Sequence, residues 1–133
     1  MTNKPKLTPV EWEIMEAIWA LGGAPSVREV LESKFITGDK AYTTVQTTMN
    51  ILVTKGMLTR KKIGLVNFYA PTQPRRSLVK NEVATIISRI FNGSAPALTN
   101  YLIDEEKLTL EEISEIKALL IAKEKQLQES DNG

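Results

Sequence analysis

The sequence contains neither cysteine nor histidine among its 133 residues. The first absence excludes disulfides, thiolate metal sites and a thiol nucleophile, and the second excludes an imidazole base or metal ligand. No apolar run approaches the roughly 20 residues of a membrane span, and the first residues do not form the apolar region of a signal peptide. These absences predict a cytoplasmic protein that holds no metal and needs no cofactor.

The same absences make an enzyme a poor interpretation. Without His or Cys, catalysis would depend on Asp, Glu, Lys, Ser or Tyr side chains. The sequence does not place a cluster of carboxylates where a pocket would form. We therefore expect a protein that is not an enzyme.

Acidic residues are missing from the middle of the chain. No Asp or Glu lies between Lys40 and Asn81, whereas eight Lys or Arg lie from Lys40 to Lys80. The net charge of +1 hides this asymmetry: residues 1–80 carry 12 Lys or Arg against 6 Asp or Glu, and residues 81–133 carry 5 against 10. Because an acid would repel phosphate at each such position, the stretch favours a surface that binds nucleic acid.

Local signals predict a mainly α-helical fold with two parts. Residues 8–11 (Thr-Pro-Val-Glu) and 26–29 (Ser-Val-Arg-Glu) are capping boxes, each of which opens a helix. A third helix over residues 41–56 precedes two strands that turn near Gly64. Three helices followed by a basic hairpin are the order of a winged helix-turn-helix domain. We predict this domain in residues 1–73.

The third helix has an unusual polar face. With residues placed about 100° apart around the axis, Ala41, Thr48, Met49 and Leu52 gather near Val45. The opposite side carries short hydrogen-bonding side chains, and Thr43, Gln46, Thr47 and Asn50 are the predicted base-reading residues. Gln and Asn can pair bidentately with adenine, and a Thr methyl group can touch the thymine methyl. The alternative is a polar, solvent-facing helix of odd composition.

The predicted hairpin is basic at its turn. Arg60, Lys61 and Lys62 crowd the end of the first strand, and with Lys55 they are predicted to hold phosphates. We expect alternating apolar contacts from the following residues: Leu58, Ile63, Val66, Phe68 and Ala70. The alternative is an exposed hairpin edge that charge protects from pairing with other strands.

Residues 74–133 are predicted to form three amphipathic helices. So short a segment offers little to cover their broad apolar faces, so we expect a partner chain, most simply a second copy. The predicted dimerisation residues are Val83, Ile87, Ile90, Leu102, Ile113, Ile116 and Leu120. The alternative is that these helices fold back onto the N-terminal domain of the same chain.

Several segments between about residues 7 and 127 carry a family resemblance. They are residues 8–15 (Thr-Pro-Val-Glu-Trp-Glu-Ile-Met) with Ile18-Trp19, 42–47 (Tyr-Thr-Thr-Val-Gln-Thr), 55–58 (Lys-Gly-Met-Leu), and Phe68-Tyr69 with Pro71. They resemble the penicillinase-repressor family of bacterial transcriptional regulators (the BlaI/MecI/CopY type). The resemblance implies a homodimer with an N-terminal winged helix and a C-terminal helical dimerisation module, which represses transcription from a palindromic operator.

Carried over by position, the resemblance assigns Thr43, Thr44, Gln46 and Thr47 to the recognition helix, and Arg60 to Lys62 to the wing. Thr44 lies away from the polar face on the helical wheel, so we assign it to phosphate binding instead of base reading. The partner is then double-stranded operator DNA. A winged-helix module that binds an acidic protein, without an operator, is the alternative function.

The resemblance also concerns how repression ends. In the branch that responds to β-lactams, a membrane-bound sensor metalloprotease controls cleavage of the dimerisation module at an Asn-Phe bond. This sequence has Asn100-Tyr101 at the matching place, a candidate proteolytic site in which the second residue differs. The copper-responsive branch uses a C-terminal cysteine motif, and its absence here excludes copper sensing by that means.

Overall fold

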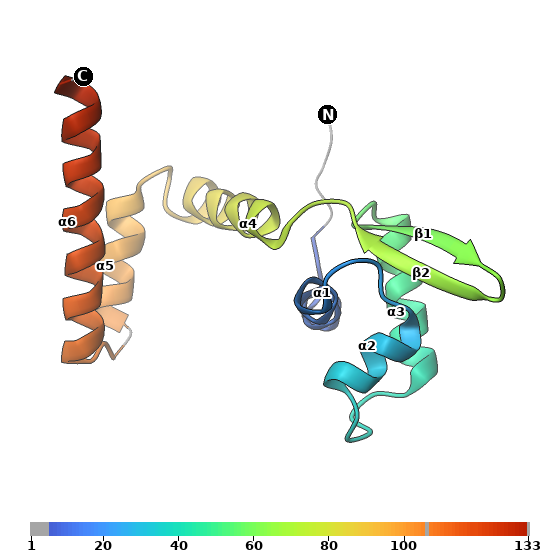
Figure 1. The fold of residues 1–133 in the computed structure, drawn as a ribbon. Coiled ribbons are helices and arrows are strands. Elements are labelled where there is room, and N and C mark those ends of the chain that lie inside the picture. The colour runs from blue at the N-terminus through green and yellow to red at the C-terminus, as the bar shows by residue number, and fades with distance from the viewer. Residues whose placement is uncertain (1–5, 106, 133) are drawn as a thin grey trace. The chain divides into compact units, whose positions relative to one another are not determined.

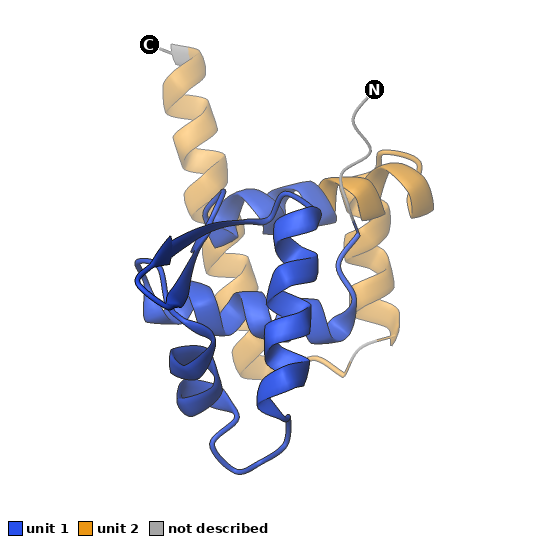
Figure 2. Cartoon of the chain, turned by 90° about the vertical axis from the view of Figure 1, so that its right-hand side faces the viewer, with its two compact units in different colours: residues 1–82 blue, residues 83–133 orange. Residues whose placement is uncertain are grey.

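The computed structural model describes residues 6–105 and 107–132 and is mainly helical, as predicted. The chain divides into two compact units, residues 1–82 and 83–133, which Figure 2 distinguishes by colour. The predicted boundary after residue 73 lies in the loop before the fourth helix, whereas the division by compactness lies within that helix. Within the described ranges, no helix is long and apolar enough to cross a membrane.

The first unit has the order of a winged helix-turn-helix domain. Three helices, α1 (Pro9–Leu21), α2 (Val27–Lys34) and α3 (Tyr42–Thr54), come before the antiparallel strands β1 (Leu58–Ile63) and β2 (Val66–Pro71) (Figure 1). The hairpin turns over two residues, since Ile63 pairs with Val66. Gly64 has a φ of +64°, which fits the first central position of a type II′ turn.

Reciprocal capping begins the first two helices, as the sequence predicts. The Thr8 hydroxyl accepts a hydrogen bond from the Glu11 amide at 3.2 Å, and Glu11 Oε1 accepts one from the Thr8 amide at 2.8 Å. Ser26 and Glu29 repeat the arrangement at the start of α2. These pairs satisfy amides that have no partner within the helix.

A glycine ends α3. Gly56 has a φ of +79°, and the Met57 amide donates back to the Leu52 carbonyl at 2.9 Å. This is the Schellman arrangement, in which a residue with positive φ lets the chain reverse and leave the helix. It directs the chain from α3 straight into β1.

The core of the first unit lies between its three helices and the hairpin. The predicted inward stripe of α3 is confirmed at Val45, Thr48, Met49 and Leu52, whereas Ala41 is the exposed N-cap residue of that helix. The buried Thr48 hydroxyl donates to the Thr44 carbonyl at 2.8 Å, so its polar atom is satisfied. The other fully buried side chains include Ile14, Met15, Ile18, Val30, Leu58 and Tyr69.

The register of the hairpin differs from the predicted alternation. Leu58 is buried, but Ile63 and Val66 are exposed, and Tyr69 is the residue of β2 that enters the core. Residues that pair across an antiparallel ladder share a face, so Arg60 and Tyr69 lie with Leu58, and Lys61 and Phe68 lie on the opposite face. The predicted alternation is wrong because side chains of a strand point alternately to its two faces, so Leu58 and Ile63, an odd number of residues apart, cannot both face the core.

Two long-range contacts hold the hairpin and the start of α4 (Arg75–Ile90) to the first helices. The Tyr69 amide donates to the Pro25 carbonyl at 2.9 Å, which ties β2 to the loop between α1 and α2. The indole of Trp19 donates to the Gln73 carbonyl at 3.0 Å, and Trp12 packs edge-on against it, with ring centroids 5.9 Å apart.

The second unit contains the end of α4, α5 (Ala95–Glu105) and α6 (Leu110–Asn132). A third capping box, between Thr109 and Glu112, begins α6. No residue described in α5 or α6 is buried. Of the seven predicted dimerisation residues, only Ile87 is half-buried, and the other six are exposed in the single chain.

Candidate nucleic-acid interface

The polar face of α3 points away from the core. On this face Thr43 and Thr47 are exposed and Gln46 and Asn50 are half-buried, while the opposite side of the helix packs inward. Thr44, which lies away from the polar face, is also exposed. The segment from α3 to the end of β2 contains no acidic residue. This surface therefore offers hydroxyl and carboxamide groups without a carboxylate that would repel a polyanion.

Asn50 lies where α3 meets the hairpin. Its side-chain oxygen, Oδ1, accepts hydrogen bonds from Arg60 Nη1 at 2.9 Å and from the Tyr69 hydroxyl at 2.8 Å. The structure thus joins two predicted DNA-binding residues, Asn50 and Arg60, to each other. The sequence pattern did not single out Tyr69, because its neighbour Phe68 is an equally good candidate for the core until the register is known.

Lys55 closes an ion pair within the domain. Its Nζ lies 2.7 Å from Glu11 Oε1 and donates to the Lys6 carbonyl at 3.1 Å. Burial raises the pKa of Glu11. The hydrogen bond and the positive charge of Lys55, together with the hydrogen bonds of Thr8, lower the pKa by more than burial raises it, so the pKa lies below its ordinary value of 4.5. The predicted phosphate-binding group is therefore already bonded inside the protein.

The three basic residues of the hairpin do not share one face. Arg60 and Lys62 alternate on the face that carries Tyr69, whereas Lys61 lies on the other face, and all three are exposed. Beyond them, Leu65 at the turn is 93% exposed. The hairpin thus presents cations on both faces and an apolar tip.

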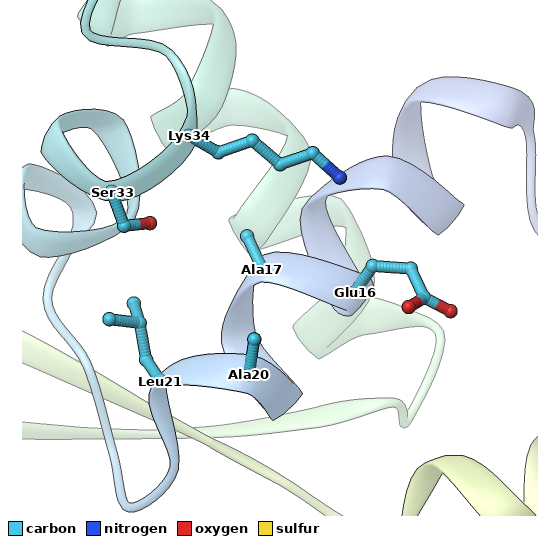
Figure 3. A pocket seen from close by; sticks show the side chains of 6 residues that line it. All are labelled: Glu16, Ala17, Ala20, Leu21, Ser33 and Lys34. Carbon is cyan, nitrogen blue, oxygen red and sulfur yellow. The ribbon is translucent and has the colours of Figure 1, made fainter.

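A shallow hollow between α1 and α2 lies apart from this surface. It is lined by Glu16, Ala17, Ala20, Leu21, Ser33 and Lys34 (Figure 3). Glu16 forms an ion pair at 2.7 Å with Arg75, at the start of α4. None of the lining residues belongs to α3 or to the hairpin, so this hollow is not part of the candidate interface.

The candidate cleavage residues lie in the second unit. Asn100 and Tyr101 are consecutive residues of α5, and both are exposed. The Tyr101 ring contacts Phe91 at the end of α4, with ring centroids 6.1 Å apart. The two side chains are therefore accessible, while the peptide bond between them lies within a helix.

An outward-facing polar helix, backed by two packed helices and followed by a basic two-stranded wing, defines a winged helix-turn-helix protein of the nucleic-acid-binding class. The chain belongs to the penicillinase repressor family, whose model matches residues 7–122. The family resemblance seen in the sequence motifs is confirmed. Members of this family are transcriptional repressors, which are not enzymes.

Two relatives match over nearly their whole length. The penicillinase repressor of Bacillus licheniformis is 26% identical over 120 residues, covering 90% of this chain and 93% of that protein. The methicillin resistance regulatory protein MecI of Staphylococcus aureus (strain N315) is 26% identical over 121 residues, covering 90% of this chain and 98% of that protein.

Solved structures of the repressor BlaI also match. The solution structure of the DNA-binding domain of the repressor BlaI is 29% identical, covers 56% of this chain and 90% of that chain, and has a TM-score of 0.49. The Bacillus licheniformis BlaI monomer in complex with the blaP half-operator is also 29% identical over the same shares of the two chains, with a TM-score of 0.46.

Proposed function

We propose that this DNA-binding transcriptional repressor acts as a homodimer on a palindromic operator. The observation that carries the proposal is the exposed surface of α3 and the hairpin, which lacks any acidic residue and carries Arg60, Lys61 and Lys62. Family membership favours this function over a winged-helix module that binds an acidic protein.

The recognition helix supplies base readout in this proposal. Gln46 is the leading base reader, with Thr43 and Thr47 on the same exposed side of α3. Thr44, Arg60, Lys61 and Lys62 contact phosphates and so orient the helix in the major groove. A good bidentate base contact contributes about 1–3 kcal/mol of discrimination, so one short helix specifies only a few base pairs.

A homodimer doubles that readout. The helices of the second unit leave large apolar side chains exposed, including Ile90, Ile116 and Leu120, which a second copy would cover. Two symmetry-related recognition helices then read half-sites about one helical turn apart, and this makes the operator palindromic. A regulator of bacterial genes works where the DNA is, so we place the protein in the cytoplasm.

Release by proteolysis extends the proposal. Cleavage between Asn100 and Tyr101 would remove residues 101–133, and with them all of α6, from the dimer. A membrane sensor metalloprotease is the partner expected to control this step. Intact-mass measurement on protein recovered from induced cells would reveal a fragment ending at Asn100, and a full-length chain alone under induction would contradict the step.

One experiment tests the central proposal. The purified protein is titrated onto a random duplex library in dilute salt, bound duplexes are selected and sequenced, and the mass of the free protein is measured by sedimentation. We expect a dimer and a palindromic consensus with two equal half-sites. A monomer that retains no duplex, or selection without a palindrome, would overturn the proposal and favour binding to an acidic protein.

A further inference from the structure

One oxygen atom links the recognition helix to both strands of the wing. Asn50 is on α3, Arg60 on β1 and Tyr69 on β2, and both donors reach Asn50 Oδ1, at 2.9 and 2.8 Å. Arg60 and Tyr69 pair across the ladder, so their side chains leave the hairpin on the same face and converge on α3. The contact therefore holds both strands at once.

We propose that Asn50 is a positioning residue that fixes the wing against the recognition helix, and that it does not read a base. The inference rests on the proposed function and revises the base-reading role expected for Asn50. Its effect is to set the spacing between the side chains that face the bases and the wing cations that face the phosphates.

Hydrogen-bonding capacity separates the two roles. Bidentate pairing with adenine needs the carboxamide oxygen to accept a hydrogen bond while its nitrogen donates one. An amide oxygen has two lone pairs, and Arg60 and Tyr69 use both in Asn50. Asn50 could read adenine in this way only by releasing one of these donors.

Tyr69 makes that release costly. Its side chain is fully buried, so its hydroxyl has no access to water as a substitute partner. A buried donor that loses its partner is destabilising, because no new hydrogen bond offsets its desolvation. Tyr69 is also held through its backbone, because its amide donates to the Pro25 carbonyl at 2.9 Å. Tyr69 thereby attaches β2 to the rest of the domain through its amide and through its hydroxyl, and Asn50 is the acceptor for the hydroxyl.

The first test uses the free protein and needs no DNA. Hydrogen exchange of the β1 and β2 amides is compared in Tyr69→Phe, which removes one hydroxyl and keeps the ring, and in Asn50→Ala. We expect both variants to speed exchange in the hairpin about two- to tenfold, while exchange in α1 and α6 stays unchanged.

Two further variants act as controls. Asn50→Asp keeps an acceptor for both donors and should restore protection of the hairpin. Tyr42→Phe removes the hydroxyl of a tyrosine at the start of α3 and should leave hairpin exchange as in the wild type. Wild-type exchange rates in Tyr69→Phe would overturn the proposed link between wing and helix.

The second test separates positioning from base reading. Tyr69→Phe and Asn50→Ala are carried through library selection and salt titration beside the wild type. We expect the same consensus for all three, with both variants binding every duplex about two- to tenfold more weakly and showing a shallower salt dependence. A base preference that disappears at one position in Asn50→Ala but is kept in Tyr69→Phe would overturn the inference. If the wild type binds no duplex, the proposed function fails, and the exchange experiment still decides whether Asn50 holds the wing.

Discussion

The Lys55 ammonium group lies 2.7 Å from the buried carboxylate of Glu11, 44 residues earlier in the chain. Glu11 Oε1 also accepts the Thr8 amide, so one oxygen caps α1 and holds the residue that follows α3. The recognition helix is thereby fixed at its C-terminal end by an ion pair and at the hairpin side by Asn50. Neither contact involves Thr43, Gln46 or Thr47, the polar side chains proposed to read bases.

Removing Lys55 tests the first of these contacts. Lys55→Met leaves the buried Glu11 carboxylate without its cation, and we expect the free energy of unfolding at pH 7 to fall by about 1–3 kcal/mol. Chemical denaturation measures the change. Arg75→Met is the matched control, because the Arg75–Glu16 pair is more exposed and should contribute less than about 1 kcal/mol. Equal destabilisation in the two variants would contradict a special stabilising role for the Lys55–Glu11 ion pair.

The same pair predicts the dependence of stability on pH. The folded pKa of Glu11 is lowered, so its contribution is present above the ordinary value of 4.5 and disappears as pH falls through the lower folded pKa. Glu11→Gln should therefore be less stable than the wild type at pH 7, and the difference should shrink below pH 4.5 as the wild-type carboxylate protonates. A difference that stays constant from about pH 7 to about pH 3 would contradict this account.

Gln46 tests base readout. Gln46→Ala should weaken binding to the selected operator about 5- to 150-fold, equivalent to about 1–3 kcal/mol, and leave binding to unrelated duplex nearly unchanged. Competition gel shifts with both duplexes measure this ratio. Gln128→Ala, on the exposed surface of α6, is the control. Equal weakening on both duplexes would show that Gln46 contacts the backbone or supports the fold.

The wing lysines test phosphate binding. Lys61→Ala combined with Lys62→Ala should weaken binding to all sequences and lower the slope of log affinity against log salt by about one unit for each phosphate that is no longer neutralised. Because the two residues lie on opposite faces of the hairpin, the single variants show which face meets the DNA backbone. Lys123→Ala with Lys125→Ala removes the same charge from α6 and should leave the slope unchanged.

The apolar face of α6 tests dimerisation. Ile116→Glu places a charge among residues that we expect a second copy to bury, so sedimentation should detect a monomer with unchanged helix content. Operator affinity should fall steeply, because each half-site is then bound separately. Lys117→Glu changes the neighbouring exposed residue and should remain dimeric. A dimeric Ile116→Glu variant would place the interface elsewhere.

Local signals in the sequence predicted most of the first unit. The capping boxes at Thr8 and Ser26 correctly predicted where the first two helices begin. The spacing of Val45, Met49 and Leu52 correctly predicted the buried side of α3. Both patterns involve residues that are close together in the chain. Gly56 and Gly64 marked the end of that helix and the turn of the hairpin.

The features that the sequence did not predict depend on long-range partners. Tyr69 was overlooked in favour of Phe68, since only the pairing register decides which of two adjacent aromatic residues faces inward. Glu11, the partner of Lys55, lies 44 residues away in the chain, and Tyr69, a partner of Asn50, lies 19 residues away, so no local sequence pattern predicts either contact. Residue type and helical spacing alone therefore do not distinguish basic and amide side chains that face DNA from those, such as Lys55 and Asn50, that bond within the protein.

The exposed Leu65 at the tip of the hairpin gives the protein a natural reporter position. Its isobutyl group buries almost nothing, so replacing it should leave folding nearly unaffected. Because the chain has no cysteine, Leu65→Cys would introduce a unique thiol. A fluorophore attached there would sit at the leading end of the wing and could follow operator engagement and release in real time, with the rest of the surface unlabelled.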